Sequence, residues 1–396
     1  MLDYQHIKKL AADAGFDLCG LTPCGHMAQN EAWLRAWLGK GYQSSLTYME
    51  RNVEKRADPR KLVEGARTAV VCAVSYKSRI GEGYPPGHRT KIASYACTAD
   101  YHTTIKGMLN GMLEHLKAAV PGLGGRAFVD TAPLLEKQLA VEAGLGWIGR
   151  QSLLVTPRHG TYVLLGELLL TDEADAYDAP FEGSRCGRCR NCIESCPTGA
   201  IIAPKVIDTG RCISCHTIER EPSGGIDLDG WIFGCDRCQS CCPHNQKAPM
   251  HANRAFDPVF DPLTMDAAAW MVLDETEFEA RMGATPLTRS GLAANDIACC
   301  VVATLSAPTA TPSIACRIQA ALGLPENRPA FDVNAACSGF IYAAAAAHGL
   351  LSTLGGSLAA RHSPAWWTRL TARPVYCLAT ARVRLFLSWP KMHRSP

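Results

Sequence analysis

The sequence predicts an α+β protein in which a mixed helix-and-strand domain is followed by a separate cysteine-rich module. Up to about residue 178, short apolar runs rich in β-branched residues alternate with amphipathic segments. Ten of the 19 cysteines then fall between residues 186 and 242. From about residue 291 the chain becomes rich in Ala and Cys and weakly charged, which indicates a third kind of segment.

Three elements are predicted in the first 120 residues. Apolar residues recur at helical spacing from Ile7 to Ala14, which predicts an amphipathic helix. The run TAVVCAVSY, at 68–76, is short, apolar and rich in β-branched residues, so it predicts a buried strand. A loop rich in Gly and Pro follows, and a second helix is predicted over 101–119.

Four more elements are predicted before the cysteines begin. The segment 126–133 predicts a strand that ends in a turn, and 134–146 predicts an amphipathic helix stopped by glycine. Residues 151–157 and 161–171 predict two further strands about a short turn that contains Gly160. This mixture indicates an α+β or α/β domain.

Composition excludes several classes of protein. The 396 residues carry a net charge of +3, which does not by itself require a nucleic-acid partner. The N-terminal segment shows no export signal, so a cytoplasmic protein with reduced thiols is expected. No apolar stretch reaches the roughly 20 residues of a membrane span. The nearest candidate, 341–360, contains His348 and predicts a buried or surface helix, so no membrane association is expected.

The cysteine spacing predicts two [4Fe–4S] clusters in a ferredoxin-like module. The run C-x2-C-x2-C-x3-C-P spans 186–197, and a second cysteine–proline step lies at 242–243. In two-cluster ferredoxins the fourth cysteine of such a run ligates the other cluster. The first cluster is therefore assigned Cys186, Cys189, Cys192 and Cys242, and the second Cys196, Cys212, Cys235 and Cys238. Cys215 and Cys241 are left over, and either could replace Cys212 or Cys242.

Structural zinc is the alternative for this module, because paired C-x2-C units also form tetrahedral sites. Zinc does not account for a third cysteine at the same spacing or for the two cysteine–proline steps. Clusters pass single electrons, so the module is predicted to deliver them to an acceptor in the preceding domain.

Four separated motifs in residues 1–289 resemble the epoxyqueuosine reductase family. They are EKRADP at 54–59, SYACTADYH at 94–102, the stretch 129–170 that begins VDTAP, and CGRCRNCIESCPTGAI at 186–201. The resemblance implies an oxidoreductase that reduces the epoxide of epoxyqueuosine to queuosine at the wobble position of tRNA. It implies two [4Fe–4S] clusters and base-off cobalamin as cofactors.

The resemblance also implies a domain plan. A cobalamin-binding, reductive-dehalogenase-like α/β domain is expected over 1–178, and the two-cluster module over 179–246. Residues 247–290 are expected to be a truncated C-terminal part of the reductase.

Asp130 is the catalytic residue that the resemblance implies, as a proton donor above the cobalt of the cobalamin. Removal of an epoxide oxygen as water takes two electrons and two protons, and a buried carboxylic acid can supply a proton. Spacing alone favours a different role for Asp130, as the N-cap of the following helix with Pro133 near its first turn.

Further cobalamin contacts implied by the resemblance are Arg56, Cys97, Tyr101 and Ser152. His102 either lines the substrate side of the corrin or is a core histidine. Gln151 stands where the family pattern has Asn, and Thr98 where it has Gly. The segment 144–152 superficially resembles a dinucleotide-binding loop, but it follows a helix instead of a strand.

The partners implied are the anticodon stem-loop of tRNA and an external single-electron donor such as flavodoxin or ferredoxin, with the protein a monomer. Five arginines around the cysteine module are either phosphate contacts or solvated charge. They are Arg185, Arg188, Arg190, Arg211 and Arg220. The alternative functions are a cytosolic reductive dehalogenase of a small molecule and a ferredoxin-type electron carrier.

Residues 291–348 resemble part of a β-ketoacyl-ACP synthase III, with Cys337 in AACSGF at the place of the acyl-accepting nucleophile. A working enzyme of that family also needs downstream His and Asn residues and an N-terminal half. We therefore expect an incomplete thiolase-like fragment, joined by gene fusion or by an assembly artefact, with a true bifunctional protein as the alternative. Residues 349–396 are unassigned.

Overall fold

The structure, a computed structural model, describes residues 1–219, 226–265, 269–270, 275–290, 297–303, 330–333 and 375–380. The chain forms two compact units. The first consists of Met1–Ile218, Asp227–Leu263 and Ala284–Leu287, and the second of Glu219–Ile226, Thr264–Gly283 and Thr288–Pro396.

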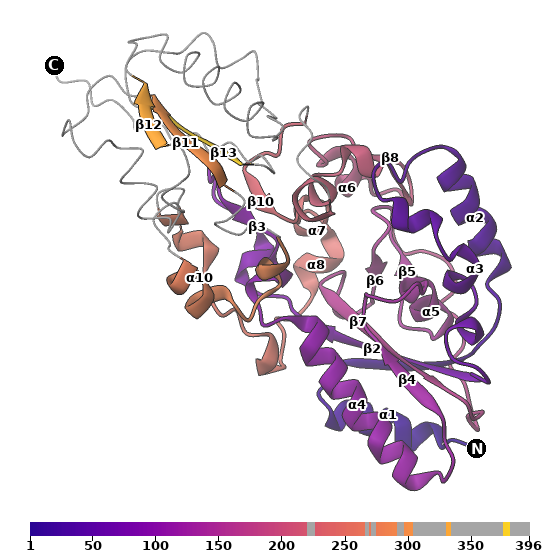
Figure 1. Cartoon of the computed structure of the whole chain (residues 1–396). Helices are drawn as coiled ribbons and strands as arrows, with labels where there is room; N and C mark the ends of the chain where they lie inside the picture. The colour runs from indigo at the N-terminus through magenta and orange to yellow at the C-terminus, as the bar shows by residue number, and fades with distance from the viewer. Residues whose placement is uncertain are drawn as a thin grey trace. The chain divides into compact units, whose positions relative to one another are not determined.

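A four-stranded sheet is the centre of the first unit (Figure 1). Its strands follow the order β1 (Leu18–Pro23), β2 (Thr68–Ser75), β7 (Val163–Leu170) and β4 (Gly125–Phe128). Every neighbouring pair is antiparallel. Of the two mixed fold classes that the sequence left open, antiparallel pairing decides for α+β.

Helices cover both faces of this sheet. Val70 and Val74 on β2 pack in one core cluster with α1 (Tyr4–Asp13) and α4 (Tyr101–Ala119). The alternate β2 residues pack in a second cluster with α5 (Glu136–Glu142). Because both faces are covered, β2 is buried along its whole length, which explains its continuous apolar run.

Gly166 on β7 allows α4 to pack closely on the sheet. A Cβ at this position would lie 2.6 Å from Ile105 Cγ2 and 2.8 Å from Leu109 Cδ1, both on α4. Such contacts are too short for any side chain, so a larger residue would push α4 away. This close packing matters because the start of α4 carries Tyr101 and His102.

Most predicted elements of the first domain are confirmed. The helix at 101–119 has the predicted bounds, and the strand at 68–76 ends one residue earlier. The two strands predicted at 151–157 and 161–171 are present as the shorter β6 (Leu154–Val155) and β7, and the Thr156–Gly160 bridge closes the turn between them. β6 pairs with β5 (Trp147–Ile148) in a separate two-stranded sheet. β1, α2 (Ala28–Gly39) and several short elements of this domain were not predicted.

Short elements make up the rest of the first unit. They include α3 (Val53–Arg56), β3 (Lys91–Ile92), α6 (Asn191–Glu194), β8 (Ile201–Ala203), β9 (Val206–Ile207), β10 (Trp231–Phe233), α7 (Arg237–Ser240) and α8 (Pro243–Lys247). β10 pairs with β3 in parallel, which joins the cysteine module to the first domain. Thr161 and Asn245 strengthen this junction, because Thr161 N donates a 2.6 Å hydrogen bond to Asn245 Oδ1.

The described part of the second unit contains α10 (Glu275–Met282) and a three-stranded sheet. The sheet has the order β12 (Ala330–Val333), β11 (Ile297–Ala303) and β13 (Val375–Thr380). β13 belongs to the segment that the sequence left unassigned. Cys337 and the apolar segment 341–360 lie outside the described residues. Among the helices that are described, none has the length and apolar character to cross a membrane.

Candidate active site and cluster sites

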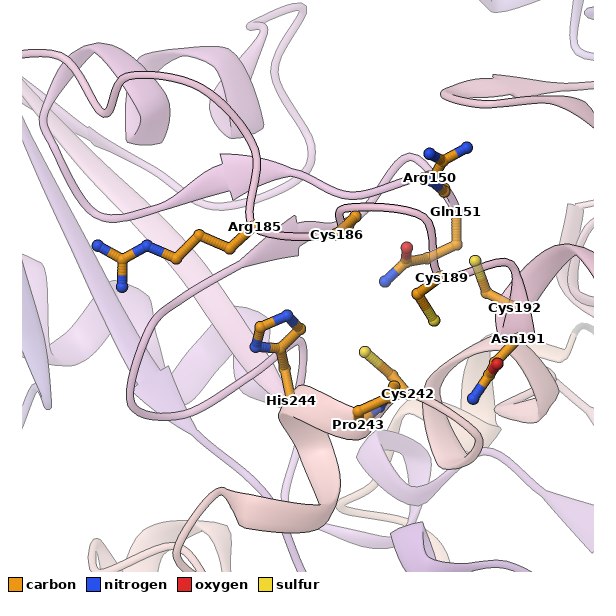
Figure 2. Close-up of a pocket in the computed structure, with 10 residues that line it drawn as sticks. All are labelled: Arg150, Gln151, Arg185, Cys186, Cys189, Asn191, Cys192, Cys242, Pro243 and His244. Atoms are coloured by element: carbon orange, nitrogen blue, oxygen red, sulfur yellow. The ribbon is translucent and has the colours of Figure 1, made fainter.

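Four thiols line one cavity of about 150 Å³ in the first unit (Figure 2). They are those of Cys186, Cys189, Cys192 and Cys242, the four residues predicted to hold the first cluster. We call this the cluster-1 cavity. Its other lining residues are Arg150, Gln151, Arg185, Asn191, Pro243 and His244.

Local backbone geometry brings these cysteines together. Cys189 N donates to Cys186 O at 3.0 Å across a turn, in which Gly187 adopts a left-handed φ of 52°. Cys242 precedes α8, where Pro243 occupies the first helical position. The cysteine–proline step that marks the motif in the sequence therefore places the fourth thiol at a helix start.

The thiols of the cluster-1 cavity repel one another when ionised. Burial raises the pKa of the Cys192 thiol to about 11, and the neighbouring thiols of Cys241, Cys242 and Cys186 raise it further. The positive charge of an iron core offsets such repulsion, so this donor set fits a cluster. Trp147 Nε1 donates to Cys186 Sγ at 3.4 Å, a contact of the kind that tunes cluster potentials.

The four cysteines assigned to the second cluster also affect the pKa values of one another's thiols. Burial raises the pKa of Cys235, and the thiols of Cys212 and Cys196 add to that rise. Burial raises the pKa of Cys238 as well, followed by the effects of Cys235 and Cys212. Cys196 differs, because hydrogen bonds from Thr198, Ala200 and Ile201 outweigh its burial and lower its pKa.

The two leftover cysteines lie beside different thiols. Cys215 is buried in a short π-helical turn, Cys215–Glu219, and its backbone hydrogen-bonds the Cys212 thiol. The charge of the Cys241 thiolate raises the pKa of the Cys192 and Cys242 thiols. In the described part of the chain, no three Cys, His, Asp or Glu side chains are placed as ligands of a single metal ion.

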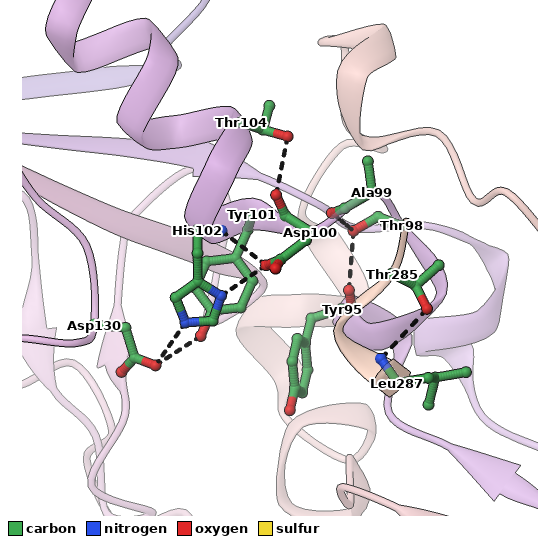
Figure 3. A network of polar contacts seen from close by, with 10 residues as sticks. All are labelled: Tyr95, Thr98, Ala99, Asp100, Tyr101, His102, Thr104, Asp130, Thr285 and Leu287. Carbon is green, nitrogen blue, oxygen red and sulfur yellow. Dashed lines mark hydrogen bonds and ion pairs between the residues drawn. The ribbon is translucent and has the colours of Figure 1, made fainter. Parts of the chain in front are cut away.

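Asp130 lies just beyond the end of β4, with a side chain that is 56% exposed. Two residues from the first turn of α4 contact its carboxyl group (Figure 3). Tyr101 Oη donates to Asp130 Oδ2 at 2.9 Å, and His102 Nε2 lies 3.1 Å from the same oxygen. Asp130 is therefore held at the side chain by two polar groups while it remains accessible.

Asp100 orients the imidazole of His102. It is the N-cap of α4, accepts the His102 backbone N–H at 3.0 Å, and lies 2.7 Å from His102 Nδ1. In a neutral imidazole one nitrogen donates and the other accepts. With Nδ1–H directed at Asp100, the lone pair of Nε2 faces Asp130, so a proton can lie between Asp130 and His102.

Asp130 does not cap the following helix. The N-cap of α5 is Leu135, which makes no side-chain capping bond. The capping role that spacing favoured for Asp130 is wrong, because Asp130 lies five positions before the observed cap. The backbone N–H of Asp130 instead donates a 2.6 Å hydrogen bond to Glu136 Oε1 on α5.

The other predicted cobalamin contacts lie at different places in the first unit. Arg56 ends α3, and its carbonyl accepts the Leu135 N–H at 3.1 Å, close to the Asp130 segment in sequence. Ser152 has a left-handed φ of 62°, and its carbonyl accepts a bond from Lys137 Nζ on α5. Cys97 is buried, with its Sγ directed at Ala93 O.

Comparison with known proteins decides the family. Residues 56–131 match the family described as epoxyqueuosine reductase QueG, DUF1730, and residues 185–245 match the 4Fe-4S double cluster binding domain. The epoxyqueuosine reductase of Cyclobacterium marinum is 38% identical over 292 residues, which cover 72% of this chain and 92% of that protein. The chain belongs to the epoxyqueuosine reductase family.

Other members of the epoxyqueuosine reductase family agree with this result. The protein of Pseudomonas aeruginosa is 35% identical over 72% of this chain and 81% of its own length. A crystal structure of epoxyqueuosine reductase with an epoxyqueuosine-modified tRNA-Tyr stem loop has a TM-score of 0.62, 26% identity, and coverage of 71% of this chain and 76% of that one. As a family member, this chain is an oxidoreductase with a 4Fe–4S double-cluster domain.

Three acidic residues of the site were not predicted from the sequence. They are Asp100, Glu136 and Glu167. A signal existed for Glu167, because it is the single charged residue in the strand VLLGELLL. An isolated charge in an apolar strand is uncommon without a specific role.

Proposed function

We propose that this chain reduces the epoxide of epoxyqueuosine in the anticodon stem-loop of tRNA, giving queuosine. The observation that carries the proposal is the accessible Asp130 carboxyl group held by Tyr101 and His102. Deoxygenation of an epoxide consumes two electrons and two protons and releases water. An acid placed beside the leaving oxygen is what this reaction requires.

Asp130 is the proposed proton donor, and its neighbours prepare it for that role. In the resting site the protonated Asp130 carboxyl group donates a hydrogen bond to His102 Nε2, which holds the acid in a defined orientation. Tyr101 Oη, which donates to the same oxygen, stabilises the carboxylate after the proton has left. Asp100 keeps the imidazole tautomer that this arrangement needs.

Base-off cobalamin is the proposed organic cofactor, held by Arg56, Cys97, Tyr101, Asp130 and Ser152. Two of these residues fit a polar ligand, because Arg56 Nε and Ser152 Oγ are buried without a hydrogen-bond partner. When bound, cobalamin supplies the metal centre at which the electrons reach the substrate.

The cluster ligands are proposed as the sequence assigned them, with Cys186, Cys189, Cys192 and Cys242 around the first cluster. The second takes Cys196, Cys212, Cys235 and Cys238. Two observations support this assignment, in which each motif gives one ligand to the other motif's cluster. The first four thiols line one cavity, and thiols among the second four raise one another's pKa values.

The tRNA partner is proposed from the neighbour whose structure contains a tRNA stem loop. The candidate phosphate contacts within the described residues are all exposed, namely Arg185, Arg188, Arg190 and Arg211. Arg190 forms an ion pair with Glu194 at 3.2 Å, so its charge is partly neutralised. Arg185 lies over the Phe181 ring, and Arg220 is outside the described residues.

The remaining parts of the proposal concern context. A flavodoxin or ferredoxin is the proposed electron donor, the protein is proposed to act as a monomer, and its tRNA substrate places it in the cytoplasm. The domain limits 1–178, 179–246 and 247–290 are kept as proposed. For 291–348, the resemblance to a condensing enzyme stays a prediction.

The test is turnover by anaerobically purified protein. An anticodon stem-loop carrying epoxyqueuosine is incubated with the protein, cobalamin and a chemical reductant, and the product nucleoside is identified by mass spectrometry. Conversion to queuosine that depends on cobalamin is expected, with no action on a haloarene control. Dehalogenation without epoxide reduction, or a preparation that binds zinc and no cobalt, would contradict the proposal.

A further inference from the structure

Glu167 is a carboxyl group in the middle of the central sheet. It lies on β7, opposite Val71 of β2 and Phe128 of β4. Its relative exposure is 0%, and both side-chain oxygens are buried without a hydrogen-bond partner. A carboxyl group that is buried in this way destabilises the fold unless a nearby group compensates it, so its presence requires an explanation.

Glu136 is the group that acts most strongly on Glu167. After burial, the Glu136 charge is the largest cause of the raised Glu167 pKa, and Asp130 contributes less. Burial also raises the pKa of Glu136 to about 7, and the Asp130 charge adds to this rise. Two buried carboxyl groups that raise each other's pKa do not both ionise at neutral pH, so the pair keeps one proton.

The Glu136 carboxylate is bonded directly to the backbone of Asp130. Glu136 Oε1 accepts the Asp130 N–H at 2.6 Å. Asp130 is at the centre of a tight turn, in which Thr131 N donates to Val129 O at 2.5 Å and the φ of Asp130 is 55°. This left-handed turn is unfavourable for a residue with a side chain and persists only where its surroundings hold it.

We propose that Glu136 is a positioning residue for Asp130, and that the buried Glu167 keeps Glu136 in place by sharing one proton with it. The proton stays on Glu167, which donates it to the free oxygen of Glu136. The other oxygen of Glu136 holds the Asp130 turn. The turn then directs the Asp130 carboxyl group to Tyr101 and His102.

Few other charged or titratable groups face this pair. Lys137, next to Glu136 on α5, directs its ammonium group to Ser152 O and weakly favours the charged form of Glu136. The charge of Glu167 contributes to the raised pKa of the Cys72 thiol on β2. On α4, Tyr101 and His102 contact Asp130, so they affect the pair only through that residue.

The proposal predicts a pH-dependent turn. Above about pH 7 Glu136 is ionised and its bond to the Asp130 N–H is charge-assisted, so the turn is held. As the pH falls below about 7, Glu136 is protonated as well, so the pair then holds two protons. A protonated Glu136 is a weaker hydrogen-bond acceptor for the Asp130 N–H. The turn therefore loosens on the acid side of pH 7, which removes Asp130 from its two partners.

Amide hydrogen exchange of the full chain, prepared anaerobically with its clusters, tests this directly. Protection of the Asp130 amide is measured against pH and corrected for the intrinsic exchange rate. In the wild-type protein, protection should rise about tenfold with a midpoint near pH 7. Glu136→Gln keeps an acceptor that cannot ionise, so the pH dependence should disappear.

Two substitutions of Glu167 complete the test. Glu167→Gln still donates to Glu136 and is neutral like the protonated Glu167, so both the protection and its midpoint should stay near those of the wild type. Glu167→Leu removes the donor, and protection should fall about tenfold at pH 8. If Glu167→Leu does not fold, the loss of pH dependence in Glu136→Gln and the retained protection in Glu167→Gln decide the matter.

Wild-type protection that is independent of pH, or protection lost in Glu167→Gln at pH 8, would overturn the proposal. It rests on the proposed role of Asp130 as the acid, but exchange is measured without substrate. If Asp130 proves dispensable for turnover, the proposed function fails while the exchange result stands unchanged. The two failures are therefore distinguishable.

Discussion

At the scale of single residues, the site is a set of carboxyl groups with different surroundings. Asp130 is exposed and held by Tyr101 and His102, Glu136 is half-buried, and Glu167 is fully buried. Burial favours the protonated form, so readiness to ionise decreases from Glu136 to Glu167. The proposed shared proton therefore lies in the core, and the proposed acid, Asp130, is exposed.

Replacement of Asp130 by Asn should remove turnover and leave the cofactors in place. The amide keeps the hydrogen bonds to Tyr101 and His102 in part but has no acidic proton, so a loss of about 10²- to 10⁴-fold in kcat is expected. Steady-state turnover on the modified stem-loop is measured beside iron and cobalt content. Undiminished turnover would remove Asp130 as the acid.

Glu167→Gln should also change how stability depends on pH. In the unfolded chain the two glutamates ionise near the ordinary value of 4.5, whereas in the native state burial raises the pKa of Glu136 to about 7 and that of Glu167 further. The native state therefore binds more protons above pH 4.5, so its free energy of unfolding falls as the pH rises.

The variant lacks one of these buried protons, so its decline should be shallower. Between about pH 6 and pH 8 the variant should gain about 1.4 kcal/mol on the wild type for each pH unit, the slope for one bound proton. Denaturant unfolding under anaerobic conditions measures the difference. Parallel curves for the two proteins would show that Glu167 does not titrate with folding.

At the scale of secondary-structure elements, short helices set the positions of the cluster thiols. The start of α8 places Cys242 in the cluster-1 cavity, while Cys241, one residue earlier, lies at the end of α7. A one-residue difference at a helix start therefore separates the proposed ligand from its neighbour.

Cys242→Ala should abolish the first cluster, with Cys241→Ala as the matched control. Because two [4Fe–4S] clusters hold about eight irons, Cys242→Ala should retain about four, and Cys241→Ala about eight. Iron and sulfide analysis with electron paramagnetic resonance of the reduced protein measures the effect. The reverse pattern would make Cys241 the ligand.

At the scale of the whole molecule, the first unit is assembled from distant parts of the chain. Residues 284–287 belong to it although 264–283 do not. Ala284 O accepts the backbone N–H of Asp100 at 2.8 Å, and Asp100 orients His102 (Figure 3). A short segment near residue 285 thus supports the start of α4.

Removal of the chain after Ser290 should leave activity intact, because residues 284–287 remain. Removal after Leu263 takes away Ala284 and the support of Asp100, so turnover should fall. Both truncated proteins are compared with the full chain in cluster content and turnover. A loss of activity on removal of 291–396 alone would show that the C-terminal segment contributes to function.

The sequence by itself determined the features that depend on local spacing. Cysteine spacing decided the thiols of Cys186, Cys189 and Cys192, because a few residues of chain bring them within reach of one another. Apolar periodicity decided β2 and α4 for the same reason. The fourth thiol, Cys242, was predicted from its cysteine–proline step and reaches the cluster-1 cavity only through the fold.

Only the tertiary structure decided the pairings of residues far apart in the chain. Tyr101 reaches Asp130 across 29 positions, and Glu167 meets Glu136 because α5 packs on β7. The pairing of β6 with β5 is another example, because the local pattern does not reveal it. Burial and proton sharing arise from packing around a group, and packing is a property of the assembled fold.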